Sequence, residues 1–230
     1  MTAKFTNTNK SGYTLVEILV ATTIFVAVVG IGVATFNAAS GFQSKTQAIQ
    51  ETNQAVRFVI EKISRDVRSA DGLQQINPVV GAPIKVFGFA LLNDQNELRT
   101  DTTTSVSRLV VIKKGQGINC DKYNQVILYS VDNHKITQDM HYTDPLIPGL
   151  ADVNNTACTG GVSSDLLGNR TDLQELIFSG LDPIQTIKQE PYLKIELNVR
   201  SLDYDSADSN ERAAVDLQTT VVPRLDGFKY

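Results

Sequence analysis

The sequence contains no tryptophan, only two cysteines and two histidines, and no surplus of basic residues. Its 21 lysines and arginines stand against 25 aspartates and glutamates, so no excess positive charge is present to neutralise nucleic-acid phosphates. Two cysteines in 230 residues argue against a disulfide-dense scaffold, and 15 glycines argue against a collagen-like chain. With 42% apolar and 20% charged residues, the composition is instead typical of a folded protein with a sizeable core.

Patterns typical of enzymes are also missing from the sequence. His134 and His141 do not belong to a known metal-binding spacing, neither cysteine has the surroundings of a nucleophile, and no glycine-rich phosphate loop follows a strand pattern. We therefore expect a protein that is not an enzyme and needs no cofactor. A weak calcium candidate is the acidic loop with Asp203, Asp205 and Asp208, but its register is not that of an EF-hand, which favours a solvated hairpin tip.

One segment near the N-terminus carries no charge at all. It runs for 27 residues from Ile18 to Ser44 and is most apolar as far as Phe36. As a helix it would be roughly 40 Å long, enough to cross a bilayer core of about 30 Å. Residues 1–12, at the start of the chain, include Lys4 and Lys10 and no acid, which predicts a cytoplasmic flank. A secretory signal peptide is disfavoured, because the apolar region of a signal peptide is shorter than this run and should be followed by a cleavage site with small residues.

Glu17 lies at the edge of this apolar run. An unpaired carboxylate in such a position costs on the order of 2–3 kcal/mol, so it predicts a functional role. A simple membrane anchor leaves Glu17 unexplained, although its side chain could also reach the headgroup region.

The stretch Ser-Gly-Tyr-Thr-Leu-Val-Glu that ends at Glu17 resembles the N-terminus of type IV prepilins and of the pseudopilins of type II secretion systems. In that family a prepilin peptidase cleaves after the glycine of a short basic leader, the new N-terminal residue is methylated, and the fifth mature residue is glutamate. The resemblance implies cleavage between Gly12 and Tyr13 and methylation of Tyr13. It also implies that Glu17 takes part in assembly, with its carboxylate beside the N-terminal ammonium of a neighbouring subunit.

The same resemblance implies the partners and the location of the protein. The expected partners are prepilin peptidase, other pilin or pseudopilin subunits and an inner-membrane assembly platform, with no direct contact to nucleic acid. We expect a single-pass protein of the cytoplasmic membrane before assembly, and afterwards a pilus or pseudopilus subunit with its head domain outside the cytoplasm.

After Lys45 the apolar residues recur at spacings of three and four, which predicts an amphipathic helix. Asp71-Gly72 is a plausible stop, with the glycine in the left-handed conformation. The sequence therefore predicts a leader over 1–12 and a helix over 13–71, transmembrane at about 15–36 and amphipathic at about 45–70. The expected buried stripe consists of Ile49, Val56, Val59, Ile60, Ile63, Val67 and Ala70.

The remainder, 72–230, has the alternating strand and turn patterns of a β-rich globular domain. Together these features predict an α+β, pilin-like fold in which the amphipathic half of a long helix packs on an antiparallel sheet. The expected strands are Ile84–Leu92, Val106–Lys113, Gln125–Val131, Lys135–Met140, Leu173–Phe178, Tyr192–Arg200 and Ala213–Val222.

The two cysteines, Cys120 and Cys158, lie in this domain. Outside the cytoplasm we expect a disulfide between them, although two separate buried thiols remain an alternative that the sequence does not exclude.

The run from Gln50 to Ala70 is similar to the helix of PilW-type minor pilins and J-type minor pseudopilins. The favoured interpretation is thus a structural minor pilin that is built into, or primes, a type IV pilus. A minor pseudopilin of a type II secretion system or of a competence pseudopilus is the first alternative. The second is a membrane-tethered binding module, for which the helix would serve only as a tether.

Overall fold

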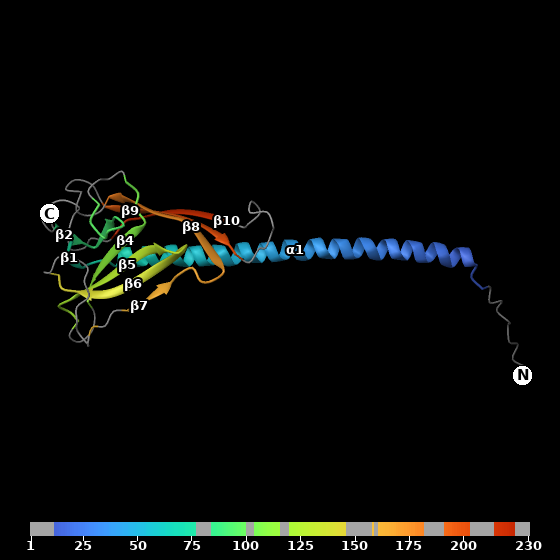
Figure 1. Cartoon of the computed structure of the whole chain (residues 1–230), viewed down its shortest axis with the longest axis horizontal. Helices are drawn as coiled ribbons and strands as arrows, with labels where there is room; N and C mark the ends of the chain where they lie inside the picture. The colour runs from blue at the N-terminus through green and yellow to red at the C-terminus, as the bar shows by residue number, and fades with distance from the viewer. Residues whose placement is uncertain are drawn as a thin grey trace, which may run out of the picture. The chain divides into compact units, whose positions relative to one another are not determined.

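The computed structural model describes residues 12–76, 84–99, 104–115, 120–145, 158, 161–181, 191–202 and 214–223. The chain divides into two compact units, Met1–Thr46 and Gln47–Tyr230. One helix, α1 (Leu15–Arg68), contributes to both, so the division falls inside the helix rather than at its end (Figure 1).

Strands β1 to β10 follow α1 in the described part of the chain, and all their pairings are antiparallel (Figure 1). They form a two-stranded sheet β1-β2, a five-stranded sheet β3-β4-β5-β6-β7 and a three-stranded sheet β10-β9-β8. A long N-terminal helix with antiparallel sheets confirms the predicted α+β, pilin-like architecture. The strands are β1 (Leu73–Ile76), β2 (Ile84–Phe87), β3 (Phe89–Leu92), β4 (Arg108–Lys114), β5 (Asn124–Asp132), β6 (Lys135–Thr143), β7 (Gly161–Asp165), β8 (Thr171–Leu181), β9 (Tyr192–Ser201) and β10 (Ala214–Val221).

Each predicted strand overlaps an observed one, but some details were wrong. The predicted strand Ile84–Leu92 is two strands, because Gly88 between them has a φ of 81°, which interrupts an extended chain. Val106 lies outside β4 and makes an isolated bridge to Phe178 of β8. Strands β1 and β7 were not expected at all.

The end of α1 also corrects a prediction, since Gly72 does not adopt a left-handed conformation. Instead the chain passes very close to β4 at this residue. A Cβ atom on Gly72 would lie 2.6 Å from Cγ2 of Ile112 and 2.8 Å from the carbonyl carbon of Lys113. Glycine is therefore needed here for close approach rather than for its positive φ.

The predicted stripe of α1 forms part of the main core. Val56, Val59, Ile63 and Val67 are fully buried in one cluster with side chains from the five-stranded and three-stranded sheets. One face of the five-stranded sheet thus packs on the stripe, as predicted, and residues of β3, β4 and β5 are also buried on the opposite face. Alternate residues of its strands belong to a second cluster, which β1 and β2 complete with residues that include Ile76 and Val86.

A buried carboxylate on α1 joins the helix to the five-stranded sheet. Asp66 accepts hydrogen bonds from Lys113 of β4, with Nζ and Oδ1 2.5 Å apart, and from the hydroxyl of Tyr129 on β5. Burial, followed by the negative charge of Asp66 and this hydrogen bond, raises the pKa of Tyr129 well above its usual value of 10.0. The tyrosine consequently stays protonated and remains a donor.

Candidate functional site

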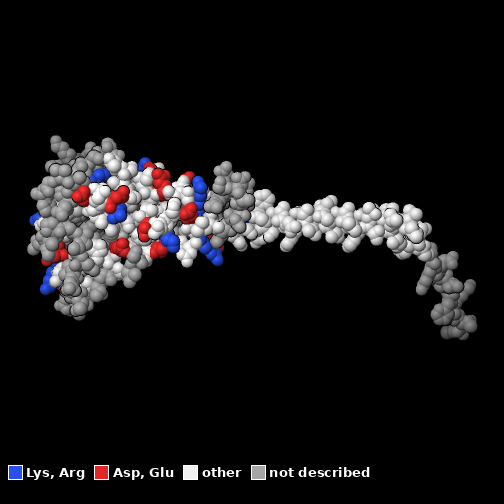
Figure 2. Space-filling view, in the orientation of Figure 1, with Lys and Arg blue, Asp and Glu red and all other residues white. Residues whose placement is uncertain are grey.

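The N-terminal part of α1 presents an exposed apolar surface. Every large apolar side chain from Leu15 to Phe42 is exposed, Leu15 to 81% and Phe25 to 68%. The face of this segment seen in Figure 2 is white, whereas red and blue groups are scattered over the rest of the described surface. Leaving one such side chain in water rather than in an apolar environment costs about 1.5–3 kcal/mol. This surface therefore requires an apolar partner, such as lipid or other helices.

The polar side chains within the segment do not conflict with an apolar environment. The hydroxyl of Thr22 donates to the carbonyl of Ile18 at 2.9 Å, that of Thr23 to Leu19 at 2.8 Å, and that of Thr35 to Ile31 at 2.8 Å. These bonds to the backbone one turn earlier leave the threonine donors satisfied without water. By length and composition the helix is able to cross a membrane.

The start of α1 brings the predicted motif residues within about one turn of each other. Gly12 and Tyr13 precede the helix and are exposed, and Thr14 is its N-cap. The hydroxyl oxygen of Thr14 accepts the N–H of Glu17 at 3.2 Å, and the carbonyl of Thr14 accepts the N–H of Ile18 at 3.2 Å. The bond between Gly12 and Tyr13 therefore lies just outside regular structure, where a peptidase can bind the chain in an extended form.

Glu17 lies in the first turn of the helix. There its negative charge interacts favourably with the positive end of the helix dipole. Thr14 and Glu17 also have the spacing of a capping box, a local sequence signal for the start of a helix at this position. Glu17 thus has a local contribution to helix stability beside any role toward another subunit.

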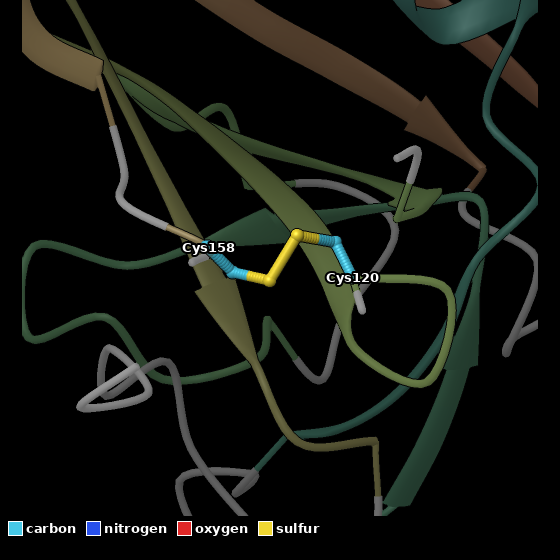
Figure 3. Close-up of a disulfide and its surroundings, with 2 residues drawn as sticks. All are labelled: Cys120 and Cys158. Carbon is cyan, nitrogen blue, oxygen red and sulfur yellow. A yellow bond between two sulfur atoms is a disulfide. The ribbon is translucent and has the colours of Figure 1, made fainter. Parts of the chain in front are cut away.

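The other candidate residues lie apart from this site. Cys120 and Cys158 form a disulfide, with their Cα atoms 5.7 Å apart and both residues buried (Figure 3). Cys120 precedes β5 and Cys158 precedes β7, so the bond connects two segments that enter the five-stranded sheet. The calcium candidates Asp203, Asp205 and Asp208 lie outside the described residues. Among the residues that are described, no group of three histidine, cysteine or acidic side chains is arranged to hold a metal ion.

We expect reduction of the disulfide to lower the free energy of unfolding of the full-length protein by about 4 kcal/mol. The two cysteines are 38 residues apart in the sequence, and without the bond the unfolded chain is no longer closed into a loop of that length. Denaturant unfolding in detergent micelles, with and without reductant, measures the change. A variant with both cysteines replaced by serine is the control and should not respond to reductant. A difference below about 0.5 kcal/mol between the oxidised and reduced protein would contradict this prediction.

Comparison with known proteins gives an informative similarity. The chain is 41% identical over 61 residues to the pilin-like protein PilA3 of Thermus thermophilus. The aligned part is 26% of this chain and 26% of PilA3, so the chain spans about a quarter of the length of the relative that it matches. No protein-family model matches the chain, and no solved structure matches it. The similarity and the long apolar N-terminal helix together support a relationship to the pilin family.

Proposed function

We propose that this protein is a structural, minor pilin-like subunit. In this proposal prepilin peptidase cleaves the chain after Gly12, Tyr13 becomes a methylated N-terminus, and the apolar part of α1 transfers from the cytoplasmic membrane into the core of a helical filament. The strand-containing unit, Gln47–Tyr230, then lies outside the cytoplasm. The protein would prime a type IV pilus or take a place in it in few copies, and the minor pseudopilin of a type II secretion system or competence pseudopilus is the related alternative.

The observation that carries the proposal is the position of the motif on the helix. Gly12 and Tyr13 are exposed immediately before α1, Glu17 is in its first turn, and an exposed, uncharged surface follows from Ile18 to Ser44. A plain anchor needs the apolar surface but not a glutamate at its edge. An assembling subunit needs both, because the α-ammonium created at Tyr13 requires a partner of opposite charge in an apolar filament core.

The mass of the native N-terminal peptide tests the proposal directly. It is measured separately on membranes and on filaments sheared from the cells. We expect a peptide that begins at methylated Tyr13 in both fractions. The control is a strain without prepilin peptidase, in which the chain should begin at Met1 and be missing from the filament fraction.

Two results would count against the proposal. A chain that still begins at Met1 in cells with active peptidase would favour a membrane-tethered binding module. A processed chain that is found in membranes but never in filaments or pseudopili would contradict the proposed assembly into a filament.

A further inference from the structure

A groove of about 860 Å³ lies between the three-stranded and five-stranded sheets, at the edge of β8. It is lined by residues 93–95, 104–107 and 173–177 and by side chains at the turn between β5 and β6. All these residues belong to the strand-containing unit. The groove is therefore separate from the N-terminal segment on which the proposed function rests.

The edge of β8 is occupied at two places on either side of the groove. At one side, Phe178 and Val106 exchange two backbone hydrogen bonds of 2.8 and 3.0 Å. At the other, the N–H of Leu173 donates to the carbonyl of His134 at 3.0 Å, and Nδ1 of His134 lies 3.0 Å from the carbonyl oxygen of Leu173. Beyond Val106 the chain turns away from β8, because Arg108 already pairs with Leu92 of β3. This divergence opens the groove.

Leu176 lies in the gap between these two contacts. In an antiparallel pair, every second residue directs its N–H and C=O to the same neighbour. Phe178 directs its N–H and C=O away from β9 and toward Val106. Leu176 is two residues earlier, and the register with β9 is uninterrupted between the two residues. The N–H and C=O of Leu176 therefore also point away from β9, into the groove. Within the described residues, no strand or bridge pairs with Leu176 on that side. One donor and one acceptor of the β8 edge are thus available to a ligand.

The side chains around the gap define which ligand fits. The side chain of Leu176 is buried on the core face, and the half-buried Val106 and Val131 line the groove. Glu175 and Asp94 are exposed there, and the lining contains no lysine or arginine among the described residues. A ligand residue paired with Leu176 would direct its side chain to the same apolar face of the sheet as Leu176. The ligand residues before and after it would direct their side chains to the opposite face, on which Glu175 lies.

We propose that this groove binds an extended peptide segment of a partner protein, which pairs with β8 at Leu176. The segment has an apolar residue opposite Leu176 and basic residues on both sides of it. Backbone hydrogen bonds provide the binding and the alternate side chains provide the specificity, as in other cases of strand addition.

The test uses the full-length protein in detergent micelles and the probe acetyl-Thr-Lys-Val-Lys-Thr-amide. We expect saturable binding by calorimetry with a Kd on the order of 1 mM, since only one residue pair is formed. Methylation of the valine nitrogen removes a backbone donor and should weaken binding about tenfold. Glu175→Gln should weaken binding about threefold through loss of one opposite charge. The matched control Asp216→Asn, which removes an exposed acid from β10 outside the groove, should leave Kd unchanged.

Three results would overturn the proposal. They are no saturable binding of the lysine probe, equal affinity of the N-methylated probe, and equal affinity of a probe with glutamate in place of both lysines. The first would show that the groove is not a peptide site, the second that strand pairing does not occur, and the third that Glu175 and Asp94 do not select the ligand. None of them would affect the proposed role of the N-terminal segment.

Discussion

Replacing Glu17 by glutamine is expected to reduce incorporation into filaments at least tenfold while membrane insertion and peptidase cleavage continue. The substitution keeps the size of the side chain and removes its charge. The ammonium at the mature N-terminus would then enter the filament core without a partner, and breaking a buried ion pair on one side costs about 3–5 kcal/mol. The ratio of the protein in sheared filaments to the protein in membranes, determined by immunoblot, measures the effect.

The Thr14 cap provides the control for this prediction. Thr14→Ala removes the hydroxyl that accepts the N–H of Glu17 but leaves the carboxylate in place. Loss of a cap costs about 1 kcal/mol of helix stability, so incorporation should fall only slightly. Equal loss with Thr14→Ala and Glu17→Gln would mean that Glu17 acts only in local helix capping. Normal incorporation of Glu17→Gln would exclude charge pairing as its role.

Asp66→Ala is expected to lower the free energy of unfolding by about 4 kcal/mol, the largest effect that we expect from a single substitution on stability. It would leave the ammonium of Lys113, whose side chain is only 18% exposed, without its partner. It would also deprive the buried hydroxyl of Tyr129 of its acceptor. Denaturant unfolding of the full-length protein in detergent gives the measurement.

Two further substitutions make this experiment specific. Glu61→Ala breaks the exposed pair with Arg65 one turn earlier on the same helix and should cost no more than about 0.5 kcal/mol. Asp66→Asn keeps an acceptor for Tyr129 and should be less damaging than Asp66→Ala. If Asp66→Ala were as mild as Glu61→Ala, the contact between α1 and the five-stranded sheet would not depend on this carboxylate.

The parts of the fold that follow from local patterns were predictable from the sequence. The stripe of Val56, Val59, Ile63 and Val67 has the period of a helix, and its burial depends only on the side chains themselves. Strand β7 was not predictable, because Gly-Val-Ser-Ser-Asp has no apolar alternation and becomes a strand only by pairing with β6. Strand β1 was missed because Gln74 is buried, a position that polar partners on β5 and β6 make possible.

The functional residues also include some that a local pattern predicts and others that only the fold brings together. Gly12, Tyr13 and Glu17 were found because the motif is contiguous in the sequence and adjoins an uncharged run. Asp66 was missed because its partners Lys113 and Tyr129 are 47 and 63 residues away in the chain. The groove beside β8 was missed for a related reason, since it arises where strands of two sheets separate.

The main core also has a consequence for the order in which the protein folds. Val56 on α1 and Val221 at the end of β10 belong to the same buried cluster, although almost the whole strand-containing unit lies between them in the sequence. Contacts between such distant residues form late, because a long loop must close first. During synthesis the apolar stripe of α1 is therefore produced long before its last partner strand. Until β10 has been synthesised, the stripe is incompletely buried and can aggregate with other chains. A chaperone that binds the stripe during this time would raise the yield of folded protein.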